Sequence, residues 1–326
     1  MTRDHGGDLD RARSTHGGGD WIDLSTGINR RPYPIPPLPP EAWTALPTAR
    51  DLDTLERAAA QAFDRAGPVV ALAGAQAAIQ LVPRLATPGR AAVLSPSYNE
   101  HAAALAAQGW TVTPAPDLSA MQGADLAVVV NPNNPDGRRW RPEVLAELAG
   151  QVGLLVVDES FADAEAGLSL VPLLPGLGDK GVVLRSFGKF YGLAGVRLGF
   201  ALASPDMAAR MRALAGPWAV AGPALAIGAV ALADRDWQAA TAARLHGDAA
   251  RLSALLAERA GWATVGACAL FVTAETGDAL AVQARLARAR IWTRAFPYSR
   301  GWLRLGLPGD AEEWARLEAA LAGGGE

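Results

Sequence analysis

The chain has 326 residues, of which 50% are hydrophobic and 19% are charged, with 33 acidic residues against 30 basic ones. This length and composition are typical of a folded protein of about two domains, and they exclude a disordered or fibrous chain. The net charge of -3 offers no field for nucleic acid or an anionic membrane, and the single cysteine, Cys268, excludes an intramolecular disulfide. We therefore expect a cytoplasmic protein without a nucleic-acid or membrane partner.

The first 45 residues contain His5-Gly6-Gly7-Asp8, a run of three glycines at 17–19 and a cluster of prolines from Pro32 onward. Gly and Pro at this density interrupt regular secondary structure. The pattern predicts an irregular N-terminal arm over residues 1–45 that lies on another part of the molecule.

Between residues 69 and 203, short apolar runs alternate with helical stretches. Continuous apolarity indicates strands that are covered on both faces, as in a mostly parallel, doubly wound sheet. The expected strands are 69–73, 91–94, 111–113, 126–130, 154–157, 182–184 and 198–203, and the helices between them include 75–86, 99–108 and 142–149. We assign residues 46–205 to one large α/β domain.

The segment from Ala213 to Ala233 has 21 residues without a charge, about the length of a membrane span. It is rich in Ala and Gly and contains Pro217 and Pro223, so it predicts a buried helix after a Pro-Trp turn instead. The rest of the chain predicts helices at 236–260 and 278–290, strands at 269–273, 291–295 and 302–307, and a last helix from 310. These elements predict a smaller α+β domain over residues 206–326, which the arm joins.

Polar segments follow directly after the expected strands, at the sheet edge where open α/β folds bind ligands. They are Gly74-Ala75-Gln76, 95–98, 131–137, Asp158-Glu159 and 186–189. Taken alone, several of these segments have ordinary explanations, such as a helix cap at Asp158 or a bare Pro/Asn turn at 131–137.

Lys189 is one of only two lysines, whereas the chain has 28 arginines; the other lysine is Lys180. A loop lysine is ordinarily a solvated charge. Here Ser186 and Arg197 supply a hydroxyl and a guanidinium fork that suit a phosphate. A lysine beside a bound phosphate is what an aldehyde cofactor needs to form a Schiff base.

The segment 186–199, Ser-Phe-Gly-Lys-Phe-Tyr-Gly-Leu-Ala-Gly-Val-Arg-Leu-Gly, resembles the lysine signature of fold-type I pyridoxal phosphate enzymes, in the class I/II aminotransferase superfamily. The resemblance covers nearly the whole chain. It implies the fold-type I α/β architecture and pyridoxal 5'-phosphate as the cofactor. It also implies Lys189 as the catalytic lysine, Asp158 as the partner of the ring nitrogen and Tyr98 as the ring that stacks on the cofactor.

The same resemblance assigns further cofactor contacts. Asn134 is placed against the phenolic oxygen of the ring, and His101 is expected to reach Asp158 from behind. The cofactor phosphate is implied to be held by Gly74, Ala75, Gln76, Ser186 and Arg197. The chain departs from the family at Asp136, where threonine is common, at Phe161, where tyrosine is common, and at Leu46-Pro47, where many relatives have Tyr-Pro.

The substrate contacts implied by the resemblance lie near both ends of the chain. Arg304, in Trp302-Leu303-Arg304-Leu305-Gly306, stands where the family holds the substrate carboxylate, although an arginine on its own is more often a surface charge. Arg294 is a second candidate for an anionic group. His5 and Asn29, with Arg30 and Arg31, are candidates for a substrate phosphate.

Three short segments resemble the cobalamin-biosynthesis branch of the superfamily: His5–Asp8, Leu24–Asn29 and Gly216–Val220. That branch includes threonine-phosphate decarboxylases, which are close kin of histidinol-phosphate aminotransferases. The resemblance implies a lyase that decarboxylates L-threonine O-3-phosphate, acts as a homodimer and uses no metal. A transaminase acting on histidinol phosphate or another amino acid, and a non-catalytic cofactor-binding protein, are the alternatives.

Overall fold

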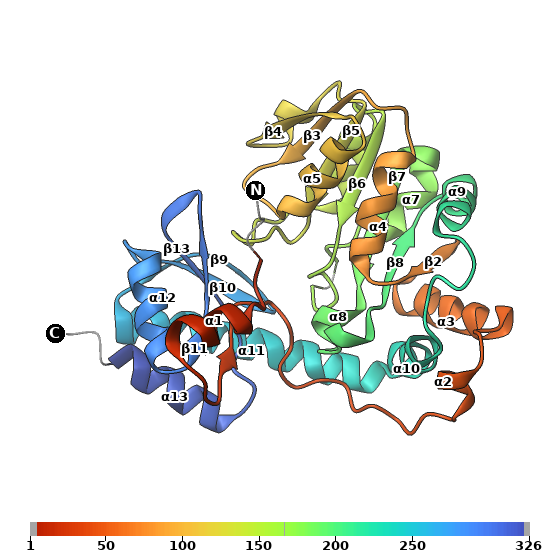
Figure 1. Cartoon of the computed structure of the whole chain (residues 1–326). Helices are drawn as coiled ribbons and strands as arrows, with labels where there is room; N and C mark the ends of the chain where they lie inside the picture. Colours follow the sequence, from red (N-terminus) through yellow and green to blue (C-terminus); the bar gives the residue numbers. More distant parts are fainter. Residues whose placement is uncertain (1–4, 166, 323–326) are drawn as a thin grey trace. The chain divides into compact units, whose positions relative to one another are not determined.

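The computed structural model describes residues 5–165 and 167–322, and the chain divides into two compact units. The large unit consists of Tyr33–Asn134 and Arg138–Ala240. The small unit consists of the described residues up to Pro32, of Pro135–Gly137, and of those from Thr241 onward. Each unit has its own sheet (Figure 1).

The large unit is built on a seven-stranded sheet in the order β2-β8-β7-β6-β5-β3-β4. Its strands are β2 (Val69–Leu72), β3 (Arg90–Leu94), β4 (Thr111–Ala115), β5 (Leu126–Val130), β6 (Leu154–Asp158), β7 (Gly181–Ser186) and β8 (Gly199–Leu202). Strand β8 runs antiparallel to β2 and β7, whereas the other neighbouring pairs are parallel. The predicted mostly parallel sheet is therefore confirmed.

The central strands are apolar throughout because helices cover the sheet. Every residue of β5 and of β6 is buried. Alternate residues, such as Val128 and Val156, belong to a core shared with α4 (Ala75–Leu81), α5 (Asn99–Ala107) and α9 (Pro205–Ala215). Helices α6 (Pro142–Ala149) and α7 (Leu174–Leu177) pack against β6 and β7 outside that core. Because β5, β6 and β7 run parallel, their carboxyl ends lie at one edge of the sheet.

In the large unit, two helices differ from the sequence prediction and one agrees with it. Helix α3 (Ala49–Ala62) was not predicted; Thr48 and Asp51 cap it reciprocally, and Leu55 and Ala59 bury its inner face. Helix α4 ends early because Pro83 lies in the short 3-10 turn that follows it. The uncharged segment forms α10 (Gly222–Ala233) after the Pro-Trp turn, as predicted. Among the described residues, no helix is long and apolar enough to cross a membrane.

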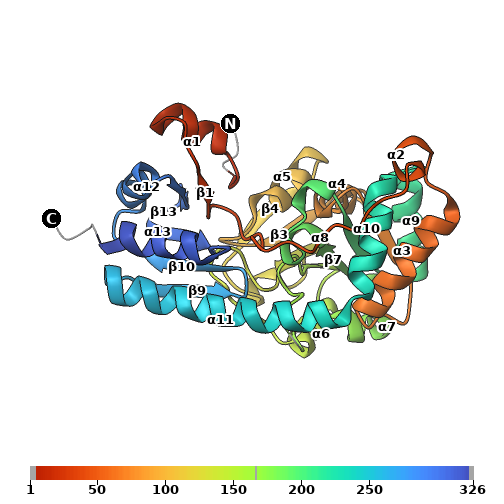
Figure 2. The ribbon, with the colours of Figure 1, turned by 90° about the horizontal axis from the view of Figure 1, so that it is seen from below.

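The small unit has the α+β character that the sequence predicts. Its antiparallel sheet has the order β12-β13-β10-β9. The strands are β9 (Ala263–Cys268), β10 (Phe271–Glu275), β12 (Arg294–Phe296) and β13 (Ser299–Gly306), and the helices are α12 (Ala279–Arg288), α13 (Ala311–Ala322) and the C-terminal part of α11 (Arg235–Ala260). Helix α13 lies beside α11 (Figure 2), where the Arg251 guanidinium is 4.1 Å from the Trp314 ring centroid.

Two predictions for the small unit are wrong in detail. The expected strand 291–295 is two strands, β11 (Ile291–Trp292) and β12, which belong to different sheets. The arm is also not irregular throughout. Asp8 caps a helix, α1 (Leu9–His16), and β1 (Ile22–Asp23) pairs in parallel with β11. Trp21 and Trp292 pack edge to face in a small buried cluster, which is the apolar contact that orders this segment. Past Pro32 the segment is extended until α2 (Glu41–Thr44).

Candidate active site

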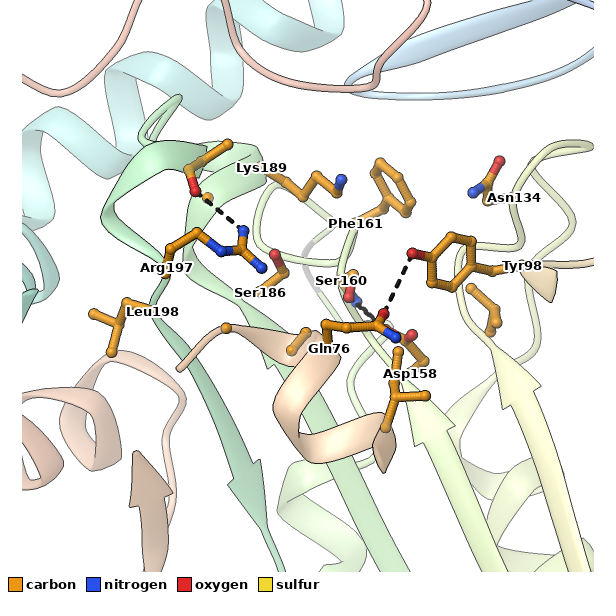
Figure 3. Close-up of a pocket in the computed structure, with 16 residues that line it drawn as sticks. Gln76, Tyr98, Asn134, Asp158, Ser160, Phe161, Ser186, Lys189, Arg197 and Leu198 are labelled. Carbon is orange, nitrogen blue, oxygen red and sulfur yellow. Dashed lines mark hydrogen bonds between the residues drawn. The ribbon is translucent and has the colours of Figure 1, made fainter. Parts of the chain in front are cut away.

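A cavity of about 150 Å³, open to solvent, lies in the large unit at the carboxyl ends of the central strands (Figure 3). All nine residues predicted to contact a cofactor line it: Gly74, Ala75, Gln76, Tyr98, Asn134, Asp158, Ser186, Lys189 and Arg197. The fold therefore brings together segments that are more than a hundred residues apart in the sequence.

Lys189 lies on the one-turn helix α8 (Phe187–Phe190), which follows β7 directly. Its side chain is half-buried and extends into the cavity toward Phe161 (Figure 3). The Nζ atom is 5.6 Å from the centroid of the Phe161 ring. Lys180, by contrast, is exposed at the start of β7 and does not line the cavity.

The helix that carries Lys189 rests on a stack of aromatic rings. Tyr191 stacks between Phe187, at a centroid distance of 4.3 Å, and Trp237, at 5.5 Å. Tyr33 and Phe190 meet Trp237 edge to face. Aromatic side chains have only two rotatable bonds and lose little conformational freedom on packing, so this stack holds α8 in place.

Asp158 ends β6 and is almost fully buried, yet both of its carboxylate oxygens have donors. His101 Nε2 lies 2.8 Å from Oδ2, and Ser160 donates its backbone N–H (2.9 Å) and its hydroxyl (2.5 Å) to Oδ1. Burial alone would raise the pKa of Asp158, but the hydrogen bonds from His101 and Ser160 and the histidine charge outweigh it, so the pKa lies below its usual value. The carboxylate is therefore negatively charged within the protein.

Ser186 and Arg197 line the cavity together with the loop before α4. Arg197 adopts a left-handed backbone conformation (φ 55°), which is strained for a residue with a side chain and is concentrated at functional sites. Its guanidinium lies against Gly74: a Cβ atom on Gly74 would be 3.0 Å from Arg197 Nη2. Gly199 in β8 is needed for the same approach, because a Cβ there would be 2.3 Å from the Ala75 nitrogen.

Tyr98 lies on the opposite side of the cavity from Arg197 (Figure 3). Its hydroxyl donates to Gln76 Oε1 over 3.5 Å, and Gln76 Nε2 donates to Glu100 Oε2 over 3.0 Å. Tyr98 also meets His101 edge to face, with centroids 6.2 Å apart. The tyrosine ring is thus held from two sides, at the position where a flat ligand could stack on it.

The Asn-Pro loop after β5 is fixed by its own side chains. Asn131 bonds reciprocally with the Trp140 backbone, donating to its oxygen (2.9 Å) and accepting from its nitrogen (3.1 Å). Asn133 accepts from the Ser97 hydroxyl at 2.7 Å. This leaves Asn134, which is 7% exposed, at the wall of the cavity.

The three departures from the family pattern lie in different surroundings. Phe161 lines the cavity and is buried. Asp136 is buried and belongs to the small unit. Leu46 is exposed on the large unit. Of the three, only Phe161 lines this cavity, so the wall there lacks the hydroxyl that a tyrosine would supply.

The predicted substrate residues lie in the small unit. Arg304 is 2% exposed; its Nη2 donates to the Ser25 carbonyl (2.6 Å), and its guanidinium lies 5.2 Å from the Phe271 ring centroid. The expectation that Arg304 is not a surface charge is confirmed. Burial, assisted by the positive charge of Arg294, lowers the pKa of Arg304 to about 9. Two neighbouring guanidinium groups that repel each other form a site suited to an anion.

A second cavity, in the small unit, is lined by two of the other candidates, His5 and Arg294. Its walls include His5, Asp8, Ser25, Arg294 and Tyr298. Arg294 stands opposite Arg304 in the register of β12 with β13. His5, from the arm, and Arg294, from the sheet, therefore share one cavity although they are far apart in the sequence.

Asn29 and Arg30 have structural partners in the small unit. Asn29 Oδ1 accepts from Arg31 N–H (3.0 Å) and from Arg244 Nη2 (2.9 Å). Arg30 Nε donates to Glu313 Oε2 at 2.7 Å. Neither residue lines the cavity that holds His5 and Arg294.

Ser160 is the site residue that the sequence analysis missed. It lines the cavity and contacts Asp158. Its position two residues after an aspartate is the spacing of an Asx turn, which is the signal that could have identified it. Within the described residues, no group of three or more His, Cys, Asp or Glu side chains could hold a metal ion.

Comparison with known proteins adds to this geometry. The family model of aminotransferase class I and II matches residues 40–321. Threonine-phosphate decarboxylase from Sinorhizobium sp. is 43% identical over 98% of this chain and 97% of its own length. The protein of the same name from Pseudomonas aeruginosa is 44% identical over 93% of this chain and 92% of its own length. Histidinol-phosphate aminotransferase from Mycobacterium bovis is 36% identical over 85% and 78%.

Among solved structures, the fold is similar to histidinol-phosphate aminotransferase from Sinorhizobium meliloti in complex with pyridoxal-5'-phosphate. The TM-score is 0.78 at 22% identity, covering 96% of this chain and 93% of the other. The family-model match over most of the chain and the sequence relatives lead to one conclusion: the chain belongs to the aminotransferase class I and II family.

Proposed function

We propose that the protein is an enzyme that decarboxylates L-threonine O-3-phosphate to (R)-1-amino-2-propanol O-2-phosphate with pyridoxal 5'-phosphate, as a step of cobalamin biosynthesis. The observation that carries the proposal is the 43% identity to a threonine-phosphate decarboxylase over nearly the full length of both chains. A second relative of that name, at 44% identity, supports the same activity.

The residues of the large-unit cavity fit this cofactor. Ser186, Arg197 and the backbone amides of Ala75 and Gln76 offer donors for its phosphate. Tyr98 offers a ring face, Asn134 an amide for the phenolic oxygen, and Lys189 the amine that binds the aldehyde. We propose residues 46–205 as the cofactor-binding domain, and residues 206–326, with the arm 1–45, as the small domain. The compact units differ from these bounds, because residues 33–45 and 206–240 belong to the large unit.

The cofactor, when bound, supplies a pyridine ring that withdraws the electron pair left behind by a departing carboxylate. The Asp158 carboxylate holds a proton on the ring nitrogen, and its hydrogen bonds from His101 and Ser160 keep it charged for that task. Lys189 Nζ is the acid that delivers a proton to the substrate α-carbon, in the place that carbon dioxide leaves. The product keeps its amine and its phosphate.

The chain also offers groups for both anionic ends of the substrate. We assign Arg304 to the carboxylate, and Arg294 with His5 to the phosphate. Asn29 remains a candidate for the phosphate through its amide nitrogen, since its oxygen already accepts two hydrogen bonds. Holding both ends fixes which bond at the α-carbon lies perpendicular to the ring, and that bond is the one that breaks.

We further propose a homodimer that acts in the cytoplasm. Among the described residues of the large unit, five large apolar side chains are exposed: Ile35, Trp43, Leu46, Trp218 and Val230. Trp218 lines the same groove as Pro47, the neighbour of Leu46. Apolar surface of this kind is typical of a protein interface, and twofold pairing is the commonest way to cover it. A single cysteine is in keeping with a reducing compartment.

The test of the function is a side-by-side assay of two substrates with cofactor-loaded protein. Threonine phosphate should release carbon dioxide, and histidinol phosphate with 2-oxoglutarate should form no glutamate. Glutamate formed from histidinol phosphate, without carbon dioxide from threonine phosphate, would move the function to the aminotransferase alternative, which the 36% identity to histidinol-phosphate aminotransferase keeps open.

A further inference from the structure

We propose that Ser25 is a positioning residue that ties the two anion-binding ends of the substrate site together: its hydroxyl seats the His5–Gly7 turn of the arm, and its carbonyl seats the Arg304 guanidinium. The inference rests on the proposed function, which assigns a phosphate to the arm and Arg294 and a carboxylate to Arg304. It adds a residue that touches neither group of the substrate directly in that assignment.

The conformation of Ser25 is set by Asp23. Asp23 Oδ1 accepts both the Ser25 backbone N–H (2.9 Å) and the Ser25 hydroxyl (2.6 Å), which closes a tight turn. Ser25 itself is 1% exposed. Because its backbone and its side chain are both bound to one carboxylate oxygen, neither its carbonyl nor its hydroxyl is free to rotate.

The hydroxyl faces the arm. The Gly7 backbone N–H donates to Ser25 Oγ at 2.7 Å. Gly6 approaches so closely that a Cβ atom there would lie 2.3 Å from the Ser25 carbonyl oxygen. Gly6 is thus required by its contact with Ser25, whereas Gly7 is required by its left-handed backbone (φ 89°). This contact holds the arm beside the cavity that His5 lines.

The carbonyl faces the sheet. Arg304 Nη2 donates to Ser25 O at 2.6 Å, and the neighbouring Gly306 N–H donates to Leu24 O at 2.7 Å. Segment 24–25 is therefore docked on the end of β13. The carbonyl oxygen of Ser25 thus orients the Arg304 guanidinium, whereas its hydroxyl accepts a hydrogen bond from the arm.

Because the hydroxyl and the carbonyl of Ser25 hold different groups, two substitutions should have different effects. Ser25→Ala removes the donor-acceptor hydroxyl but leaves the backbone bond to Asp23, so it should disturb the arm and spare Arg304. Asp23→Ala releases the whole turn, so it should disturb both ends. A residue that only stabilised the fold would not separate the phosphate end from the carboxylate end.

The experiment measures kcat and KM for threonine phosphate, and inhibition by inorganic phosphate and by free L-threonine. Ser25→Ala should raise KM and the inhibition constant of phosphate about fivefold, the size expected for one neutral hydrogen bond, with kcat changed less than twofold and inhibition by threonine unchanged. Asp23→Ala should weaken inhibition by both probes. Ser25→Thr, which keeps the hydroxyl, should restore KM.

Two further variants approach the contact from the arm. Gly6→Ala would press a methyl group against the Ser25 carbonyl oxygen, which also holds Arg304, so it should weaken inhibition by both phosphate and threonine. For phosphate, the double variant with Ser25→Ala should be less than additive, because both changes disturb the same contact with the arm. Gly18→Ala is the matched control in the same arm, since nothing lies within 4 Å of a Cβ at that position. Ser14→Ala is the matched serine control, because its exposed hydroxyl bonds only within α1.

Hydrogen exchange gives a readout that needs no turnover. The peptide containing Gly7 should exchange faster in Ser25→Ala than in the unaltered protein. Equal exchange, or an unchanged KM in Ser25→Ala while the unaltered protein is active, overturns the inference alone. Failure of the unaltered protein to turn over threonine phosphate overturns the proposed function, and with it the substrate role given to Ser25.

Discussion

His101 Nε2 lies 2.8 Å from Asp158 Oδ2, and the two side chains are 1% and 3% exposed. The contact joins the first turn of α5 to the end of β6, and β4, β5 and α6 lie between these two elements in the sequence. A buried carboxylate is stable as an anion only when donors or a positive charge compensate for lost hydration. His101 and Ser160 provide that compensation for Asp158.

Asp158→Asn should retain the cofactor, because Lys189 and the proposed phosphate ligands Ser186 and Arg197 are unchanged. It should lose at least about two orders of magnitude in kcat. Removing one partner of a buried charge pair costs about 3 to 5 kcal/mol, and every 1.36 kcal/mol is tenfold in rate. His101→Ala should lose less, because Ser160 still donates twice to Asp158. Turnover at matched cofactor content measures both, and a larger loss for His101→Ala would reverse this ranking.

The purified protein should be yellow, and borohydride should attach the cofactor to Lys189. The reagent converts the link between a lysine amine and an aldehyde into a stable secondary amine. Lys180 is an internal control because it is exposed outside the cavity. Peptide mapping locates the label, and a label on Lys180, or none on cofactor-saturated protein, would contradict the assignment.

The titration of Asp163 should lower the free energy of unfolding as the pH rises from about 4 to 6. Burial, together with the negative charge of Glu159, raises the pKa of Asp163 from 3.8 to about 6, although Arg185 opposes the shift. Because the native state binds the proton more tightly than the unfolded state, the favourable contribution is full below the unfolded pKa and is lost as the pH passes the folded one. The shift corresponds to about 3 kcal/mol.

Asp163→Asn removes this titration, so its unfolding free energy should fall less than that of the unaltered protein between pH 4 and 6. Urea unfolding at a series of pH values measures the difference in slope. The comparison cancels the contribution of Asp158, whose lowered pKa acts in the opposite direction in both proteins. Parallel pH curves for the two proteins would show that Asp163 does not titrate in this range.

Free threonine should be a poor substrate, because it lacks the phosphate that Arg294 and His5 are proposed to bind. Arg294→Ala should therefore reduce kcat/KM for threonine phosphate far more than for an unphosphorylated amino acid, since anchoring a remote group contributes to turnover as well as affinity. Equal losses for the two substrates would remove Arg294 from the phosphate site.

Sedimentation should show a species of twice the mass of the chain. Replacing the exposed Trp43 and Leu46 with Glu should shift it toward monomer and reduce activity, because burying charge in an apolar interface is unfavourable. The control is Ala257→Glu, at an exposed residue of α11 in the small unit that lines neither the large-unit cavity nor the cavity of His5 and Arg294. A monomer that retains full activity would contradict the proposed dimer.

Nine of the residues that line the large-unit cavity were predicted from the sequence, and the resemblance to the class I/II aminotransferase superfamily assigned them to the cofactor. Two local signals predicted the sheet and the edge at which these residues meet. Continuous apolar runs identify strands covered on both faces, and polar residues directly after such strands must meet at one edge of the sheet. Lys189 and Asp158 end neighbouring parallel segments of that pattern, so their meeting depends only on the local order of elements.

Contacts between distant segments were decided by the tertiary structure. Ser25 bonds with Gly7 and with Arg304, and Asn29 bonds with Arg244; no periodicity links these residues in the sequence. The arm became partly regular because Trp21 could be buried against Trp292, which the sequence places 271 residues later. Local propensity determines which segments become strands and helices, whereas burial of side chains against remote segments determines which polar groups finally meet.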